Sequence, residues 1–186
     1  EPWMPVSRIS QIVEVTNGVQ ADLIVLLGDY VASVKKFRTR AIPAMEWAKP
    51  LGNLKAPLGV YAILGNHDWW EDVDEVRAGF RSVDIPVLEN HTLKIDKNGL
   101  RFWLAGLGDQ LAHYLGGRHR FRGEDDLDGT LRPTQADSDP VVLLAHEPDI
   151  FPRVPKRVTL TLSGHTHGGQ VWLPFVGRPV LPSRYG

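Results

Sequence analysis

Four short apolar runs in this chain each stop at a small residue, and each is followed directly by side chains that bind metals or transfer protons. The runs read DLIVLL, GVYAIL, VVLLA and VTLTL. Largely uninterrupted apolar strands are typical of a sheet that is covered on both faces, so the pattern predicts an α/β fold built in layers. Helical patterns at residues 7–20, 44–49 and 72–82 precede or follow the first two runs. Ser7 is the expected cap of the first helix.

A hairpin pattern makes the expected sheet mixed rather than purely parallel. HTLKID and LRFWLAG alternate like strands and are joined by a turn that contains Asn98 and Gly99. Residues 111–139 are polar and predict a loop with a short helix, and QVWLPF predicts one further strand.

The composition excludes several classes of protein and site. The 186 residues suit one domain, and the absence of cysteine rules out disulfides, zinc–thiolate sites and thiol nucleophiles. A net charge of −1 lacks the basic excess of a general nucleic-acid binder. The longest apolar runs are far shorter than the roughly 20 residues that a membrane span needs.

The side chains behind the four runs are expected to meet, because ligands in layered α/β folds gather outside the carboxyl ends of the strands. A glycine or alanine before each group lets the backbone turn sharply or approach an ion closely. The groups are Asp29; Asn66, His67 and Asp68; His146; and His165 with His167. Taken singly, His146 fits a hydrogen-bonded or a surface residue, and Asp29 fits a simple turn. The four groups together favour a metal centre.

His165 and His167 predict two ions rather than one. Residues i and i+2 of an extended chain point the same way, with Cα atoms roughly 6.6 Å apart. A single ion does not easily take both imidazoles at short range, whereas two ions about 3.5–4 Å apart take one each. Thr166 is then expected to face away.

The blocks GDYV, GNHD, LLAHEPD and SGHTHGGQ resemble, in order and approximate spacing, the motifs of the calcineurin-like metallophosphoesterase superfamily. The resemblance covers nearly the whole chain. The last 23 residues, from Gly164, look similar to a bacterial branch with membrane-associated phosphoesterases and UDP-diacylglucosamine pyrophosphatases. The resemblance implies a four-layer α/β/β/α sandwich with mixed sheets.

The resemblance also implies residue roles in a two-metal centre. Asp29 matches the carboxylate that bridges both ions. Asn66, His146 and His165 match the other protein ligands of the second ion, and His167 matches a ligand of the first. His67 matches the catalytic histidine that stabilises phosphoryl charge and protonates the leaving oxygen. For Asp68 two roles stay open: orienting His67, or fixing the loop by hydrogen bonds.

One motif of the family is missing. Its Asp-X-His, at the end of a first strand, has no match before Ser7, and relatives usually continue beyond Gly186. We therefore expect residues 1–186 to be a single domain trimmed at both ends, without its first strand and its C-terminal strands. The second-ion site keeps four ligands and should bind. The first-ion site keeps only His167 and Asp29, so it should bind weakly or stay empty.

These implications predict metal-dependent hydrolysis of phosphate esters or pyrophosphate bonds, through two divalent ions and a bridging water. The intact protein is expected to hold two ions of Mn, Fe, Zn or Mg, and this chain is expected to hold one. The alternative is a catalytically inactive metal-binding fragment or scaffold that lacks Asp-X-His. A protein serine/threonine phosphatase is disfavoured, since Ala32-Ser33-Val34 replaces the usual Asp-Arg-Gly.

The substrate is expected to be a phosphorylated small molecule or a nucleotide-sugar lipid. Arg118, Arg120 and Arg122 fit either an anion clamp at the mouth of the site or a solvated loop. The pair Trp69-Trp70 fits a pocket wall or packing beneath the loop. Asp109 ends another strand pattern as a candidate acceptor near the site. The expected location is the cytoplasm or the cytoplasmic membrane surface, with peripheral association.

Overall fold

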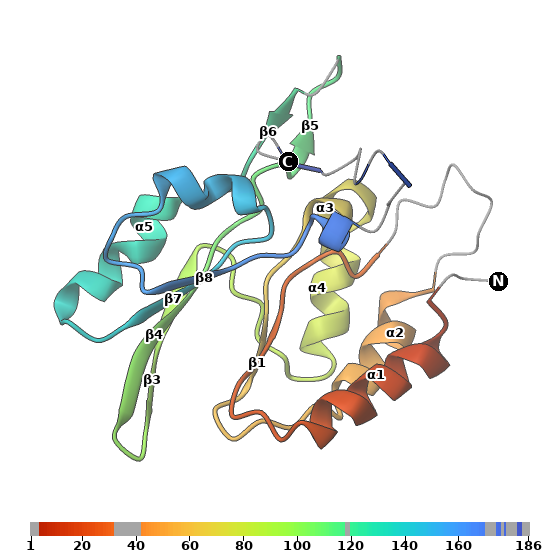
Figure 1. Ribbon diagram of the computed structural model, residues 1–186. Helices are drawn as coiled ribbons and strands as arrows, with labels where there is room; N and C mark the ends of the chain where they lie inside the picture. Colours follow the sequence, from red (N-terminus) through yellow and green to blue (C-terminus); the bar gives the residue numbers. More distant parts are fainter. Residues whose placement is uncertain are drawn as a thin grey trace.

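The computed structural model describes residues 4–31, 42–117, 120–169, 174–175, 177 and 182–183, in which helices flank two packed β-sheets and a third, two-stranded sheet is also present (Figure 1). The helices are α1 (Val6–Gly18), α2 (Ala44–Leu51), α3 (Asn66–Glu71), α4 (Val73–Arg81) and α5 (Leu127–Leu131). The strands are β1 (Ile24–Leu26), β2 (Val60–Ala62), β3 (His91–Lys97), β4 (Leu100–Gly106), β5 (His113–Tyr114), β6 (Phe121–Arg122), β7 (Val141–Leu144) and β8 (Leu160–Leu162). Short 3₁₀ turns are η2 (Arg132–Ala136), η3 (Pro148–Arg153) and η4 (His167–Gly169).

The sheets are mixed, as the hairpin pattern predicts. β1 and β2 form one parallel pair, and the larger sheet has the order β3-β4-β7-β8. Within it β3 and β4 are antiparallel, whereas β4–β7 and β7–β8 are parallel. Asn98 and Gly99 turn the β3–β4 hairpin with positive φ angles of 53° and 83°.

Three hydrophobic clusters separate four layers. The first packs Trp47 of α2 and Phe80 of α4 against β2, and the second lies between the two sheets. The third packs α5 and η3 against β4 and β7. Within β7 the neighbours Leu143 and Leu144 point to different clusters, because successive strand residues face opposite sides. This helix–sheet–sheet–helix order confirms the predicted layered α/β fold.

One local prediction is wrong, and another is incomplete. The first helix begins at Val6, and the carbonyl of Pro5 accepts the amides of Arg8 and Ile9, so Ser7 lies inside the helix rather than capping it. The GNHD block does not simply end a strand: it turns directly into α3, because the Asp68 carboxylate accepts the amide of Gly65 and closes the first turn. The strand predicted in QVWLPF falls mostly on residues outside the described part.

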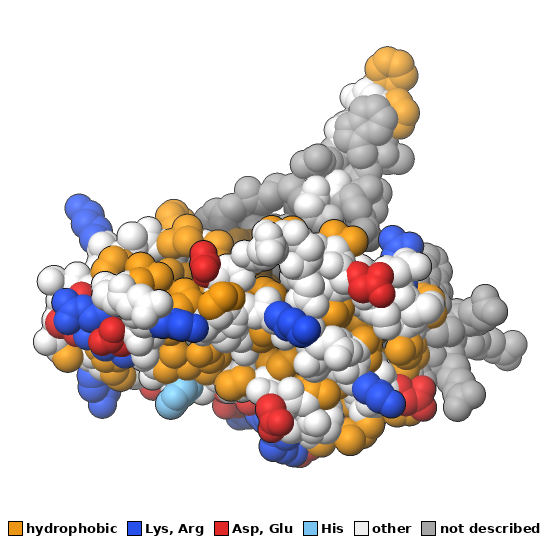
Figure 2. Space-filling model, turned by 90° about the horizontal axis from the view of Figure 1, so that it is seen from below, with side chains coloured by type: hydrophobic (Ala, Val, Ile, Leu, Met, Phe, Trp, Pro, Cys, Tyr) orange, Lys and Arg blue, Asp and Glu red, His pale blue; other side chains and the backbone are white. Residues whose placement is uncertain are grey.

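The surface carries both signs of charge. Figure 2 shows that Lys and Arg side chains alternate with Asp and Glu across the described part of the face seen from below. None of the described helices combines the length and apolar character needed to cross a membrane.

The aromatic cluster beneath the first sheet supplies a stability prediction. Phe80 is fully buried, and its ring lies 4.5 Å from Tyr30 and 5.4 Å from Trp47 between centroids. Phe80→Ala should lower the free energy of unfolding by about 3–5 kcal/mol in urea denaturation, because it leaves a cavity. The matched change Phe151→Ala, at a side chain that is 67 % exposed, should cost less than about 0.5 kcal/mol. Equal losses would contradict this assignment of the core.

Candidate metal centre

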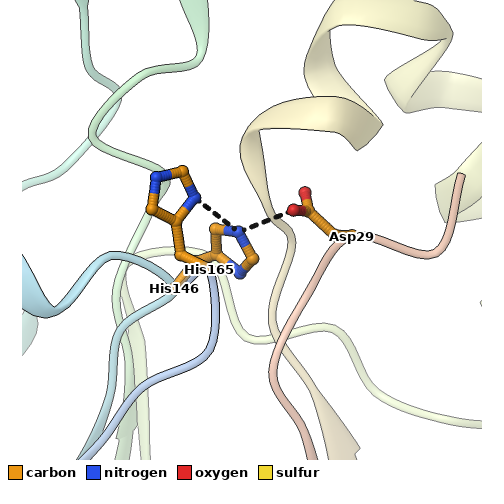
Figure 3. Close-up of side chains that lie close together, drawn as sticks. All are labelled: Asp29, His146 and His165. Atoms are coloured by element: carbon orange, nitrogen blue, oxygen red, sulfur yellow. Dashed lines mark hydrogen bonds and ion pairs between the residues drawn. The ribbon is translucent and has the colours of Figure 1, made fainter. Parts of the chain in front are cut away.

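Three side chains from three different strand ends lie together (Figure 3). Asp29 follows β1, His146 follows β7 and His165 follows β8, and one ligand-capable atom of each lies within 4.8 Å of the others. Nε2 of His146 lies 3.1 Å from Oδ2 of Asp29 and 3.3 Å from Nδ1 of His165. The structure therefore brings together residues that are separated by more than a hundred positions in the sequence.

The His146 ring is oriented by a backbone contact. Its Nδ1 lies 2.5 Å from the carbonyl oxygen of Leu27. A carbonyl only accepts hydrogen bonds, so Nδ1–H donates and Nε2 is directed at Asp29. A carbonyl partner of this kind fixes the ring of many metal-binding histidines. Nε2 of His146 is thus positioned for a proton or a cation shared with Asp29.

Electrostatics couple these two residues. Burial alone would raise the pKa of Asp29, but the hydrogen bond and charge of His146 outweigh it and lower the pKa. Burial alone would lower the pKa of His146, but Asp29 outweighs it and raises the pKa. Burial lowers the pKa of His165. Without a cation the first two form an ion pair; a divalent cation would compete with that proton.

Glycines allow this close approach. A Cβ on Gly28 would lie 2.6 Å from Nδ1 of His146, and one on Gly65 would lie 2.4 Å from Oδ1 of Asp29. Both positions therefore exclude any larger residue, and Gly28 also has a φ of 96°. At positions 28 and 65 the glycine before the candidate ligand is therefore a steric requirement of the site.

The loops that carry the candidate ligands have strained backbones. Asp29, His165 and His167 have positive φ angles of 62°, 62° and 51°. Such conformations cost energy for residues other than glycine and tend to occur at functional sites. The extended geometry expected for residues 165–167 is wrong: the amide of Thr166 donates to the carbonyl of Gly164 at 2.7 Å, and η4 begins at His167.

Asp68 holds two of these loops together. Its Oδ1 accepts the amides of Tyr30 at 2.8 Å and Val31 at 3.3 Å, and its Oδ2 accepts those of Asp29 at 3.0 Å and Gly65 at 2.8 Å. Burial raises its pKa to about 6, although these backbone hydrogen bonds act in the opposite direction. Of the two roles left open for Asp68, these contacts support fixing the loops.

Buried oxygens without hydrogen-bond partners test whether the residues fit a metal. Among the described residues, Asn66 Oδ1, Asp109 Oδ2 and Glu147 Oε1 are in this state, whereas Asp29 Oδ2 is paired with Nε2 of His146 at 3.1 Å. Buried polar atoms normally have partners, and an unsatisfied oxygen is costly unless a donor or cation reaches it. Asn66 offers such an oxygen in a cavity that His165 also lines, and Asp29 offers a carboxylate beside His146 and His165. Together they form a donor set suited to divalent transition metals. The residues therefore fit the implied cation.

Glu147 is a residue that sequence reasoning missed. Glu147 is 3 % exposed, and its neighbour Asp109 is 1 % exposed. Burial is the main cause that raises the pKa of Asp109, and the nearby charge of Glu147 raises it further. The amide and side chain of Gln110 both donate to Oε2 of Glu147 at 3.2 Å. The available signal was its place directly after His146 in LLAHEP. The centre thus has more acidic groups nearby than Asp29 alone.

Two cavities adjoin the centre. One of about 540 Å³ is lined by Asp29, His146, His165 and His167. The other, of about 640 Å³, has Asn66, His67 and His165 on one side, and Trp70, Leu111 and Phe121 among its other lining residues. We call this second space the side cavity. Trp70 therefore forms a wall, whereas Trp69 packs against the guanidinium of Arg77, 4.9 Å from its ring centroid.

The structure describes two of the three arginines of the predicted clamp. Arg118 lies outside the described residues. The Arg122 side chain is 66 % exposed and 3.9 Å from Glu124, and Arg120 is exposed. Neither belongs to the described lining of the side cavity, whereas Arg153 does and pairs with Asp125 at 3.0 Å. The clamp and the solvated loop therefore both remain predictions.

The comparisons with known proteins agree with this geometry. Residues 6–169 match the family model described as calcineurin-like phosphoesterase. A Caenorhabditis elegans protein named as a metallophosphoesterase is 38 % identical over 91 % of this chain and 34 % of its own length. A Danio rerio transmembrane protein with a metallophosphoesterase domain is 32 % identical over 99 % of the chain and 42 % of its length. The phosphodiesterase YaeI of Escherichia coli is 31 % identical over 97 % of the chain and 61 % of its length.

A solved structure shares the fold. NAD nucleotidase of Haemophilus influenzae superposes with a TM-score of 0.55 over 86 % of this chain and 35 % of its own, at 14 % sequence identity. At this identity the likeness concerns the fold alone. In all of these comparisons the chain spans less than two thirds of the matching protein.

Metal binding by the full-length protein tests the centre. Asp29→Asn removes the charge at the point shared with His146, so affinity for Mn²⁺ in calorimetry should fall by about 10- to 100-fold or more. Asp22→Asn makes the same chemical change at an exposed position before β1 and should leave affinity unchanged. Equal Mn²⁺ affinities in all three proteins would refute the assignment.

Proposed function

The chain belongs to the calcineurin-like phosphoesterase family, and we propose that the whole protein hydrolyses phosphate ester or pyrophosphate bonds at a centre of two divalent ions. The observation that carries this proposal is the convergence of Asp29, His146 and His165 at the mouth of an open cavity. The unsatisfied oxygen of Asn66 supports it.

The proposed ligands divide between two ions. Asp29, Asn66, His146 and His165 would hold one ion, and Asp29 with His167 would contribute to the other. Bound divalent ions would neutralise charge on the phosphoryl oxygens and lower the pKa of the attacking water. The amide of His67 holds the Asp29 carboxylate, and the carbonyl of Leu27 holds the His146 ring, before substrate arrives, which lowers the reorganisation that binding requires.

His67 is the proposed proton donor to the leaving oxygen. It lies in the first turn of α3, and its amide donates to Oδ1 of Asp29 at 3.0 Å, which ties its position to that of the shared carboxylate. Its side chain lines the side cavity together with Asn66 and His165. An imidazole at this place would stabilise phosphoryl charge and donate a proton to the leaving oxygen.

The proposed substrate class is a phosphorylated small molecule. The Escherichia coli relative is named a phosphodiesterase. This name supports phosphoester chemistry. An open cavity of about 640 Å³ beside His67 is large enough for such a molecule.

Turnover of synthetic esters tests the activity. Full-length protein with Mn²⁺ should release p-nitrophenol from p-nitrophenyl phosphate or bis(p-nitrophenyl) phosphate, and Asp29→Asn should abolish that release. The exposed change Asp22→Asn should keep wild-type rates. Mn²⁺ binding without turnover of either ester would contradict the enzyme and favour the inactive metal-binding module.

A second variant tests the proton donor. His67→Gln should lower kcat by about 10²- to 10⁴-fold, the usual contribution of a positioned acid, while Mn²⁺ affinity stays unchanged. The loss should be greater for a phenyl ester than for a p-nitrophenyl ester, because the poorer leaving group needs protonation more. The same loss for both esters would argue for a purely structural role of His67.

A further inference from the structure

One wall of the side cavity is aromatic and takes no part in the proposed chemistry. Trp70 and Phe121 form this wall with Leu111, and the same cavity reaches Asn66 and His67 of the centre. We propose that this wall binds a planar aromatic group carried by the phosphoryl group of the substrate. The inference rests on the proposed function and adds a substrate class to it.

The rings form a continuous series that leads away from His67. The centroid of Trp70 lies 5.2 Å from that of His67 and 5.5 Å from that of Phe121, and Phe121 lies 5.5 Å from Tyr114. Trp70 and Phe121 are nearly parallel, at 17°, and stack on each other. A group attached to a phosphoryl oxygen beside His67 would thus meet Trp70 first and Phe121 next.

The wall is held in place before anything binds. The indole Nε1–H of Trp70 donates to the carbonyl of Leu111 at 2.9 Å, and Trp70 belongs to the helix that also carries His67. Phe121 lies in β6, where it pairs with Tyr114 of β5. Both side chains are carried by secondary structure. The protein therefore needs little ordering when a ligand ring stacks on them, and little binding free energy is lost.

The polar rim favours a flat ring with polar edges over an alkyl chain. Gln110, Asp125, Asp149 and Arg153 line the same cavity as the wall. An alkyl chain would desolvate these groups without offering hydrogen bonds in return. A planar aromatic group stacks on the wall through its face and leaves its edge free for the rim. The volume of about 640 Å³ lies in the usual range for small-molecule sites.

Two kinds of substrate carry such a ring, an aryl ester and a nucleotide, and ligand binding distinguishes them. Calorimetry on Mn²⁺-loaded full-length protein should show benzylphosphonate binding about 2- to 10-fold more tightly than cyclohexylmethylphosphonate, which matches it in size but is not flat. In the second arm, adenosine 5′-monophosphate should bind more tightly than ribose 5-phosphate if the ring is a nucleobase. A preference for benzylphosphonate alone identifies an aryl ester as the substrate. A preference for adenosine 5′-monophosphate alone identifies a nucleotide.

Variants of the wall connect the preference to this cavity. Phe121→Leu and Trp70→Leu should each reduce the aromatic preference toward unity while affinity for methylphosphonate stays within about twofold. Phe151→Leu, at an exposed ring outside the lining of this cavity, is the matched control and should keep the preference. Melting temperatures of all variants establish that they are folded.

The outcomes separate this inference from the proposed function. No aromatic preference in either arm, or a preference that survives both Phe121→Leu and Trp70→Leu, would overturn the inference. If p-nitrophenyl phosphate and its bis ester are not turned over but benzylphosphonate binds with the predicted preference, the proposed function fails and the ring subsite stands.

Discussion

The carboxylate of Asp68 is the interaction on which the candidate centre depends most. It accepts amides from the loop after β1 and from the turn after β2, so it joins two segments that are distant in sequence. That junction sets the backbone of Asp29 in its left-handed conformation and aligns the start of α3, which carries Asn66 and His67. Its complete burial explains why a single charged residue can hold both loops: water does not compete for its oxygens.

The second constraint comes from the packing of the two sheets. The cluster between them, with Ile63, Leu104 and Leu144, holds β2 of one sheet against β4 and β7 of the other. This packing places the ring of His146, at the end of β7, on the carbonyl of Leu27, at the end of β1. The distance from Asp29 to His146 is therefore a consequence of core packing, and the glycines at positions 28 and 65 permit it.

The helices and strands were largely predictable because their apolar patterns follow from burial. The β3–β4 hairpin could be predicted from Asn98 and Gly99, because asparagine and glycine adopt positive φ angles at low energetic cost. Backbone conformation at the site was not readable in this way. Nothing local in GHTHG requires a left-handed His165, and the extended geometry assumed for it was wrong; contacts from other strands stabilise the turn.

The sequence by itself determined the layered α/β fold and the residue types at the strand ends, because continuous apolar runs and short glycine-flanked motifs are local properties. Only the tertiary structure decided which of these side chains meet: Asp29, His146 and His165 come together, and Glu147 and Asp109 form a buried acidic pair whose two members the sequence did not connect. Tertiary structure also set Phe121 of a distant hairpin against Trp70. Such pairings depend on how separate elements pack, and packing energy is shared among residues that are far apart in the sequence.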